Sequence, residues 1–206
     1  MARTTLIRFG AVACVGAAVL AIAALVGFIA VVGSDPIADA AEKAVFYVPA
    51  AAALGSAVLL ALGLVGLYLC QEERFGPFGA VGFSIALLGT IAAASAQWTY
   101  LFVVPHFAPV APEMVNESTG SVLVGFVLSY AILALGWILF GLATLRAGIF
   151  PRWVSLLVVA GAAIAFLPLP SRTLVLAVAV AILGVRLLRN AGAAEAATSS
   201  APAFVR

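Results

Sequence analysis

Charged side chains are scarce in this chain. Only 9% of its 206 residues are Asp, Glu, Lys or Arg, whereas 66% are hydrophobic. A soluble domain carries charge on roughly a quarter of its residues, so the composition excludes a surface that faces mainly water. A net charge of +2, spread along the chain, gives no basis for nucleic-acid binding. Only two cysteines are present, Cys14 and Cys70, both in or beside apolar runs, so we expect no structural disulfide.

Signatures of catalysis and of cofactor binding are also missing. The sequence contains no phosphate-binding glycine loop, no His-Glu-x-x-His motif and no evident pairing of a nucleophile with a base. These absences favour a non-enzymatic role, and we expect no cofactor.

Six long apolar runs make up most of the chain. Each is close to the roughly 20 residues that an α-helix needs to cross a bilayer. They predict an all-α, polytopic transmembrane bundle over residues 1–189, with short loops and a disordered cytoplasmic tail over 190–206. The last two runs are short and meet at Pro168 and Pro170, so a re-entrant hairpin that does not cross is the alternative there. The predicted spans are 9–32, 50–69, 79–104, 122–145, 153–169 and 173–188.

The basic residues in the gaps predict an orientation. Lys43 and Arg172 are the only basic residues in one set of alternate gaps, and the other eight occupy the termini and the remaining gaps. By the positive-inside rule both termini then face the cytoplasm, in a multi-pass protein of the cell membrane. The eight are Arg3, Arg8, Arg74, Arg146, Arg152, Arg186, Arg189 and Arg206. The acidic residues of the opposite, outer side are Asp35, Asp39, Glu42, Glu113 and Glu117.

One outer gap carries its own helical pattern. Asp35 followed by Pro36 is typical of a helix N-cap with proline at the first helical position. Apolar residues then recur at helical spacing up to Val48, opposite Asp39, Glu42 and Lys43. This pattern predicts one short amphipathic helix on the outer leaflet.

The two longer inner turns resemble one another. Arg, Gly, Pro and Phe occur together in residues 74–78 and again in residues 146–152. Spans two and three and spans four and five are therefore either duplicated hairpins or unrelated tight turns of similar composition. Residues 147–153, Ala-Gly-Ile-Phe-Pro-Arg-Trp, resemble a turn of small uncharacterised bacterial and archaeal six-span integral membrane proteins, in which Pro-Arg-Trp opens a helix. The resemblance implies the six-span layout and no activity or site.

Apart from Arg186, near the end of the last run, the predicted spans contain no charged side chain. This argues against ion-coupled transport, because proton and ion relays use titratable groups inside the membrane. Milder polarity marks two helical faces. Thr90 and Gln97 share a face of the third span, and Tyr130 and Trp137 share a face of the fourth. These four are the candidate ligand-facing residues, and the alternative is a packing seam between helices. Four glycines likewise predict close helix contact: Gly63, Gly66, Gly82 and Gly89.

The outer gap over residues 105–120 holds the only histidine of the chain. His106 lies there with Glu113 and Glu117. An imidazole and two carboxylates can bind a divalent metal, so these three are the candidate metal ligands. The alternative is a solvated acidic loop.

Two hypotheses of function follow. The first is a non-enzymatic membrane protein that binds or passes a small neutral or lipid-like molecule, or that serves as a subunit of a membrane complex. The second is a membrane-embedded enzyme with a polar or metal site at its outer face. The expected partners are membrane lipid and either a second copy of the chain or a membrane partner protein, with no nucleic acid.

Overall fold

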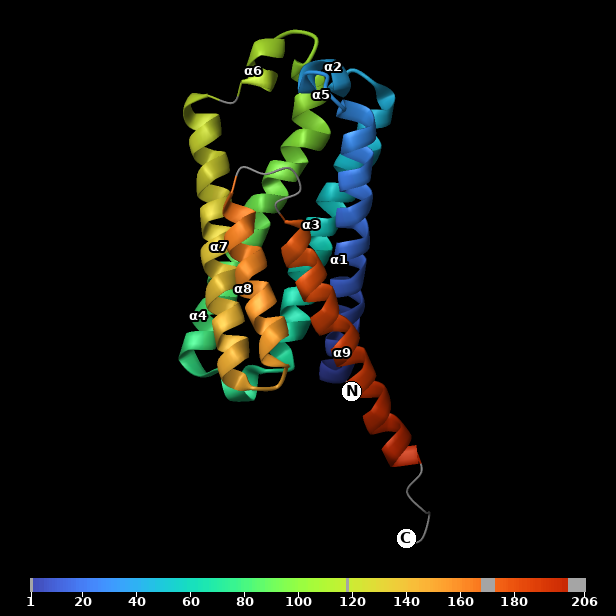
Figure 1. Cartoon of the computed structure of the whole chain (residues 1–206), viewed down its shortest axis with the longest axis vertical. Coiled ribbons are helices and arrows are strands. Elements are labelled where there is room, and N and C mark those ends of the chain that lie inside the picture. Colours follow the sequence, from blue (N-terminus) through green and yellow to red (C-terminus); the bar gives the residue numbers. More distant parts are fainter. Residues whose placement is uncertain (1, 118, 168–172, 200–206) are drawn as a thin grey trace, which may run out of the picture.

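The computed structural model describes residues 2–117, 119–167 and 173–199. This part of the chain is all-helical and contains no β-strand (Figure 1). The long helices are α1 (Ala2–Val32), α3 (Tyr47–Leu69), α4 (Glu72–Trp98), α7 (Gly120–Ala147), α8 (Arg152–Phe166) and α9 (Leu174–Ser199). The short elements are α2 (Ile37–Ala41), the 3₁₀-helix η1 (Ala44–Phe46), the π-helix η2 (Thr99–Val103), α5 (Val104–Phe107) and α6 (Pro112–Asn116).

Four helical stretches of the described chain are long and apolar enough to cross a membrane, judged by length and composition. They are Arg3–Val32, Ala44–Leu69, Glu72–Phe107 and Pro112–Ala147, and they indicate a membrane location. α8 has 15 residues and is therefore about 22 Å long, shorter than the roughly 30 Å hydrocarbon core of a bilayer. Six spans and the orientation of the termini stay predictions, and the turn over residues 168–172 lies outside the described residues.

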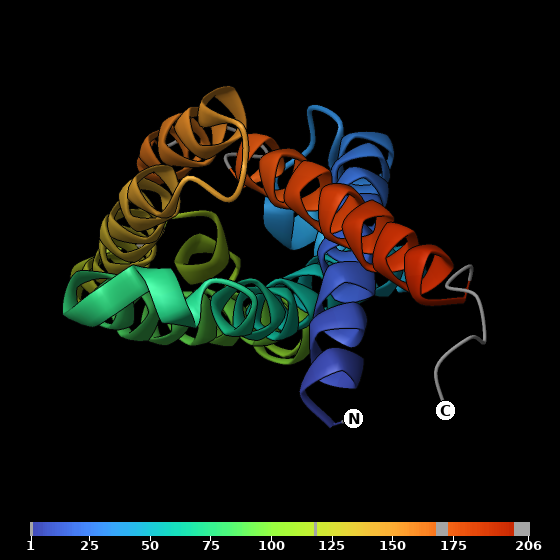
Figure 2. The ribbon, with the colours of Figure 1, turned by 90° about the horizontal axis from the view of Figure 1, so that it is seen from below.

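The long helices form a closed ring of contacts. Along the chain, α1 packs on α3, α3 on α4, α4 on α7, α7 on α8 and α8 on α9, and α9 returns to α1. Figure 2 shows this order around the ring, and Figure 1 shows that α8 and the start of α9 lie well below the outer ends of α1, α4 and α7. The ring is therefore complete in one half of the molecule and lacks two of its helices in the other.

Glycine sets the distance between helices at the closest contacts. A Cβ added to Gly89 of α4 would strike the Leu133 backbone of α7, and one added to Gly82 would lie 3.0 Å from the Phe140 nitrogen. On the other side of the ring, a Cβ on Gly66 of α3 would lie 2.7 Å from the Cα of Gly10. Gly63 meets Cys14 of α1 in the same way. The prediction that these glycines permit close helix contact is confirmed.

The two turns at one end of the ring share a backbone feature. Gly76 (φ 57°) and Gly148 (φ 67°) both have a positive φ, which glycine adopts without a steric penalty. The first precedes Pro77 and the second precedes Pro151, the residue before α8. Proline is suited to the start of a helix. In each turn the glycine therefore ends one helical segment, and the proline that follows begins the next. A duplication of the two hairpins stays a prediction.

Charge is divided between the two ends of the ring. We call the end that holds the start of α1, the α3–α4 turn, the α7–α8 turn and the later part of α9 the basic end, and the other the acidic end (Figure 1). At the basic end Arg3 forms ion pairs with Glu72 at 2.8 Å and with Glu73 at 3.2 Å, which join α1 to the start of α4. The basic end carries Arg3, Arg8, Arg74, Arg146, Arg152, Arg186 and Arg189, and the acidic end carries Asp35, Asp39, Glu42, Glu113 and Glu117.

The predicted short helix is present as α2, with Asp39 exposed and Ala38, Ala40 and Ala41 buried, but its length and its cap differ from the prediction. Helix ends at Ala41 and resumes only as a 3₁₀ turn, and Asp35 makes no capping hydrogen bond; its carboxylate pairs with Lys43 at 3.0 Å instead. The buried face of this segment packs on protein, where Ala38 N–H donates to Asn116 Oδ1 over 3.0 Å. A segment with such partners covers the acidic end of the ring, and its position on the outer leaflet stays a prediction.

α9 continues as helix to Ser199, beyond the end of the last predicted span, and a disordered tail over residues 190–206 stays a prediction. The segment over residues 190–199 is rich in alanine, the best helix former, and no stop signal separates it from the apolar part of α9. Residues 200–206 lie outside the described residues.

Candidate functional site

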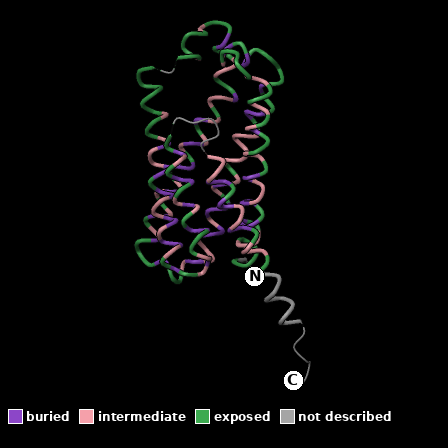
Figure 3. The backbone as a smooth tube through the Cα atoms, in the orientation of Figure 1, coloured by how far each residue is buried: buried purple, intermediate pink, exposed green. Residues whose placement is uncertain are grey.

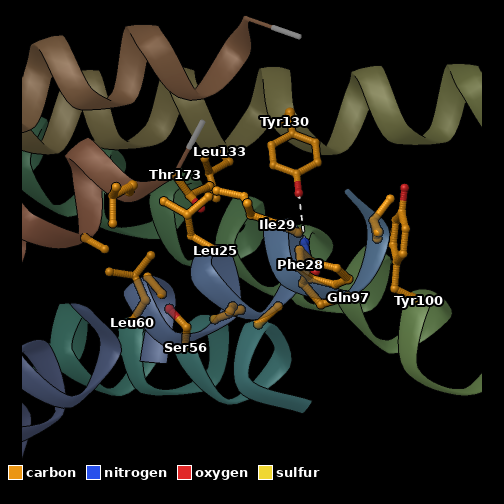
Figure 4. A pocket seen from close by; sticks show the side chains of 18 of the residues that line it. Leu25, Phe28, Ile29, Ser56, Leu60, Gln97, Tyr100, Tyr130, Leu133 and Thr173 are labelled. Carbon is orange, nitrogen blue, oxygen red and sulfur yellow. Dashed lines mark hydrogen bonds between the residues drawn. The ribbon is translucent and has the colours of Figure 1, made fainter. Parts of the chain in front are cut away.

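A cavity of about 550 Å³ lies inside the ring and is partly open to the outside. Side chains from α1, α3, α4, α7 and α9 surround it, and η2 and the segment covering the acidic end complete its wall (Figure 4). Its size falls in the range of about 300–1,000 Å³ that small-molecule sites occupy. The lining residues are Ala21, Ala24, Leu25, Phe28, Ile29, Val32, Gly33, Ile37, Phe46, Ala53, Ser56, Ala57, Leu60, Thr90, Ala93, Gln97, Tyr100, Phe126, Tyr130, Leu133, Thr173, Leu174 and Ala177.

None of these lining residues is charged, and most of the wall is aliphatic or aromatic. Helix–helix contacts occupy some of the polar groups. Ser56 donates its hydroxyl to the Ala17 carbonyl at 2.8 Å, which joins α3 to α1. Thr90 donates to the Ala86 carbonyl of its own helix at 2.7 Å. The wall therefore offers a ligand few hydrogen-bonding groups, and those few have definite positions.

One polar feature of the wall is a pair of side chains from two helices, Gln97 and Tyr130. Gln97 Nε2 donates a hydrogen bond to Tyr130 Oη over 3.0 Å, from α4 to α7 (Figure 4). Gln97 makes no other side-chain hydrogen bond within the described chain, so its Oε1 and its second N–H are available to a ligand. Tyr130 is 3% exposed and stacks on Phe126 with ring centroids 5.9 Å apart, which fixes the phenol in place.

Trp137 does not line the cavity, unlike the other three candidate ligand-facing residues. It is fully buried, and its Nε1 donates to Thr90 Oγ1 over 2.9 Å. Thr90 thus stands between the cavity and the indole. The two interpretations of these polar faces, ligand site and packing seam, therefore apply to different residues. Gln97 and Tyr130 face the cavity, whereas Trp137 lies in the packing seam between α4 and α7. Thr90 belongs to both, because it lines the cavity and accepts the hydrogen bond of the indole.

The outer part of α7 stands apart from the other helices. Residues 120–128 are exposed except Phe126, and a Cβ added to Gly125 would meet nothing within 4 Å (Figure 3). On the facing side, Ile29 of α1 lines the cavity and is 64% exposed. Because α8 ends and α9 begins well short of the acidic end that α1 and α7 reach, these two helices are missing from the cavity wall on this side (Figure 1).

The candidate metal ligands are not brought together. His106 lies in α5, Glu113 lies in α6, and Glu117 follows α6. Within residues 2–117, 119–167 and 173–199, no three His, Cys, Asp or Glu side chains form a group that could hold a metal ion. All three of these residues are exposed at the acidic end.

Several lining residues were not candidates from the sequence. Tyr100 enters the wall from η2, a π-helical turn closed by the Val104 N–H to the Thr99 carbonyl. Phe46 and Ile37 enter from the segment that covers the acidic end. No sequence period marks these positions, because they depend on where the chain folds back after α1 and α4.

No known protein family, no curated protein and no solved structure matches this chain. The geometry of the cavity is therefore the basis for assigning a function.

Proposed function

We propose that this protein binds a small neutral amphiphile in its central cavity, a molecule with a hydrocarbon body and a hydroxyl or carbonyl headgroup. The observation that carries the proposal is an apolar cavity of about 550 Å³ whose most available polar group is the Gln97 amide, held by Tyr130. An amide both donates and accepts hydrogen bonds, so it suits a hydroxyl or a carbonyl equally.

The absence of charge from the cavity wall favours a neutral ligand. Moving an ionised group from water into such a site, with no opposite charge to receive it, carries a large desolvation penalty. A hydrocarbon body, in contrast, is stabilised by contact with Leu25, Phe28, Leu60 and Leu133. A neutral headgroup attached to such a body fits both properties of the wall.

We further propose that the ligand enters from the lipid, between α1 and the outer part of α7. The exposure of Ile29 and the absence of packing around Gly125 support this route. Large exposed apolar residues surround both positions, among them Val26 (60% exposed) and Val124 (64% exposed), as expected where a surface faces hydrocarbon. An amphiphile already dissolved in a bilayer would reach the cavity without crossing water.

The experiment uses Trp137 as a reporter behind the cavity wall. Trp98 and Trp153, which are 56% and 54% exposed, are changed to phenylalanine so that Trp137 is the only tryptophan. A brominated long-chain alcohol, which quenches indole fluorescence at short range, is titrated into the purified protein in detergent. We expect saturable quenching by the alcohol and none by a brominated alkyl sulfate of the same chain length.

A matched pair of variants locates the quencher. Ala57 lines the cavity and Ala51 faces outward on the same helix, α3. Ala57→Phe should abolish the saturable phase by filling the cavity, and Ala51→Phe should leave it unchanged. Quenching that rises linearly with the alcohol in every variant would mean simple partitioning into detergent and would overturn the proposal.

A further inference from the structure

A second concave site lies on the outside of the ring, between α1 and α9. It has a volume of about 570 Å³, and eight of its ten lining residues are alanine, valine or isoleucine. The remaining two are Arg186 and Arg189, which lie toward the basic end. The groove and the central cavity share no lining residue. The groove is therefore a distinct site.

The groove exists because two helices cross at one tight contact and diverge from it. At the crossing, a Cβ added to Gly184 of α9 would lie 2.6 Å from the Ala11 carbonyl oxygen and 2.7 Å from Cys14 Cβ of α1. Figure 2 shows α9 crossing α1 at an angle. Small side chains at Ala18 and Ala181 keep the floor of the groove low, and Val19 (60% exposed) stands at its edge.

The two arginines form a single cationic group. They are three residues apart on α9, so they lie on one helical face. The Arg186 guanidinium lies 5.5 Å from the centre of the Trp153 ring, a cation–π contact that positions the charge without neutralising it. Among the described side chains neither arginine forms an ion pair.

We propose that this groove binds one anionic phospholipid, with its phosphate on Arg186 and Arg189 and an acyl chain along the apolar floor toward Ile22 and Val178. Guanidinium groups match phosphate oxygens in charge and geometry. Basic pockets between membrane helices are recognised sites for anionic headgroups. An apolar groove that ends at two cations, neither of which pairs with a described acidic side chain, complements both parts of such a lipid. A zwitterionic headgroup would carry its own positive charge to the same place.

The test measures lipid binding to the full chain by native mass spectrometry from detergent. Phosphatidylglycerol is added to the wild-type protein, and phosphatidylcholine with the same acyl chains serves as the comparison. We expect preferential retention of phosphatidylglycerol. The double variant Arg186→Gln and Arg189→Gln should weaken its binding by about tenfold or more. The control is Arg146→Gln with Arg152→Gln, which removes the same charge from the basic end outside the groove and should change binding little.

Further variants test the contributions of the charged headgroup and of the acyl chain separately. Arg186→Lys with Arg189→Lys keeps the charge and should retain most of the preference, which also checks that the glutamine variant lost charge rather than its fold. Ala181→Phe fills the groove and should weaken lipid binding, whereas Ala163→Phe, on the exposed face of α8, should not.

Three results would overturn the proposal. Equal retention of the two lipids would show that the headgroup charge is not recognised. An equal loss in the Arg146 and Arg152 control would show a diffuse effect of charge. Glycerol phosphate that competes as well as the intact lipid, together with no effect of Ala181→Phe, would identify a site for free phosphate instead.

Discussion

The side-chain amide of Gln97 donates a hydrogen bond to the hydroxyl of Tyr130 across 3.0 Å, joining α4 to α7 at the wall of the central cavity. A glutamine in apolar surroundings requires such a partner, because an unpaired amide in that position costs about 1–3 kcal/mol. The phenol is itself fixed by stacking on Phe126. The pair therefore holds the remaining amide oxygen and N–H in a definite place.

The first prediction concerns this amide. Gln97→Leu removes the group that we assign to the ligand headgroup, so the affinity for the brominated alcohol should fall by about tenfold, the value of one hydrogen bond of about 1.4 kcal/mol. Titration of Trp137 fluorescence measures it. The control is Ser95→Ala, since the Ser95 hydroxyl donates to the Ile91 carbonyl of its own helix and lies on another, exposed face. Unchanged affinity in Gln97→Leu would remove Gln97 from the site.

The second prediction compares two buried threonines that differ in their hydrogen bonds. Thr90 Oγ1 accepts from Trp137 and donates to Ala86, whereas Thr144 Oγ1 has no hydrogen-bond partner in the described chain. Thr90→Val should lower stability by about 1–3 kcal/mol because it leaves the indole N–H unpaired. Thr144→Val should raise it by about 1 kcal/mol because it removes an unpaired buried hydroxyl. Thermal unfolding in detergent measures both, and shifts of the same sign would contradict the assignment.

The third prediction uses two glycines of α7. A Cβ at Gly136 would strike the backbone of Ala86, which cannot move aside, whereas Gly125 has open space around it. Gly136→Ala should therefore lower the unfolding free energy by about 1–3 kcal/mol through overpacking. Gly125→Ala should leave it unchanged or raise it by up to about 1 kcal/mol through helix propensity. Equal effects would show that α4 and α7 do not approach as closely as the structure places them.

The fold was predictable from the sequence where each residue's role depends on its own helix. The apolar runs predicted the positions of the long helices. The close helix contacts were predictable from four glycines, because a glycine permits close approach by whichever helix packs on it: Gly63, Gly66, Gly82 and Gly89. Asp35 shows the limit. Its side chain fits a helix cap, but Lys43 lies 3.0 Å away and forms an ion pair with it instead.

The candidate site was predictable only in part, since helical spacing identifies a face but not what covers it. Thr90, Gln97 and Tyr130 line the cavity. Trp137 is two helical turns from Tyr130 on α7, but it is covered by α4 and lies in the contact between the two helices. The difference depends on where α4 crosses α7. Tyr100 was missed because its place in the wall depends on the π-helical turn at residues 99–103.

The fourth prediction concerns the thiol of Cys70, just beyond the end of α3. Burial raises its pKa to about 11, and the nearby Arg3 guanidinium acts in the opposite direction. Because the thiolate is the reactive form, only about one molecule in a thousand is reactive at pH 8. The alkylation rate should therefore rise about tenfold per pH unit between about pH 8 and 10. Iodoacetamide labelling of a Cys14→Ala variant, followed by mass spectrometry, measures this dependence.

Two comparisons sharpen the thiol prediction. A cysteine in a short peptide, with a pKa of about 8.5, should approach its maximum rate above about pH 9, where Cys70 is still accelerating. Arg3→Gln removes the opposing effect and should slow Cys70 further at each pH. A rate for Cys70 that levels off together with that of the peptide would mean that the thiol is not buried as described.

A map of the sites at which a neutral amphiphile contacts the protein tests directly whether the central cavity binds such a molecule. A long-chain alcohol that carries a photoreactive diazirine is bound to the full chain, irradiated, and its adducts are located by mass spectrometry. The cavity assignment predicts adducts on Leu25, Phe28 and Tyr130 that saturate with dose and disappear in Ala57→Phe but not in Ala51→Phe. Adducts confined to exposed side chains such as Val19 and Leu88, unsaturable and equal in both variants, would contradict it.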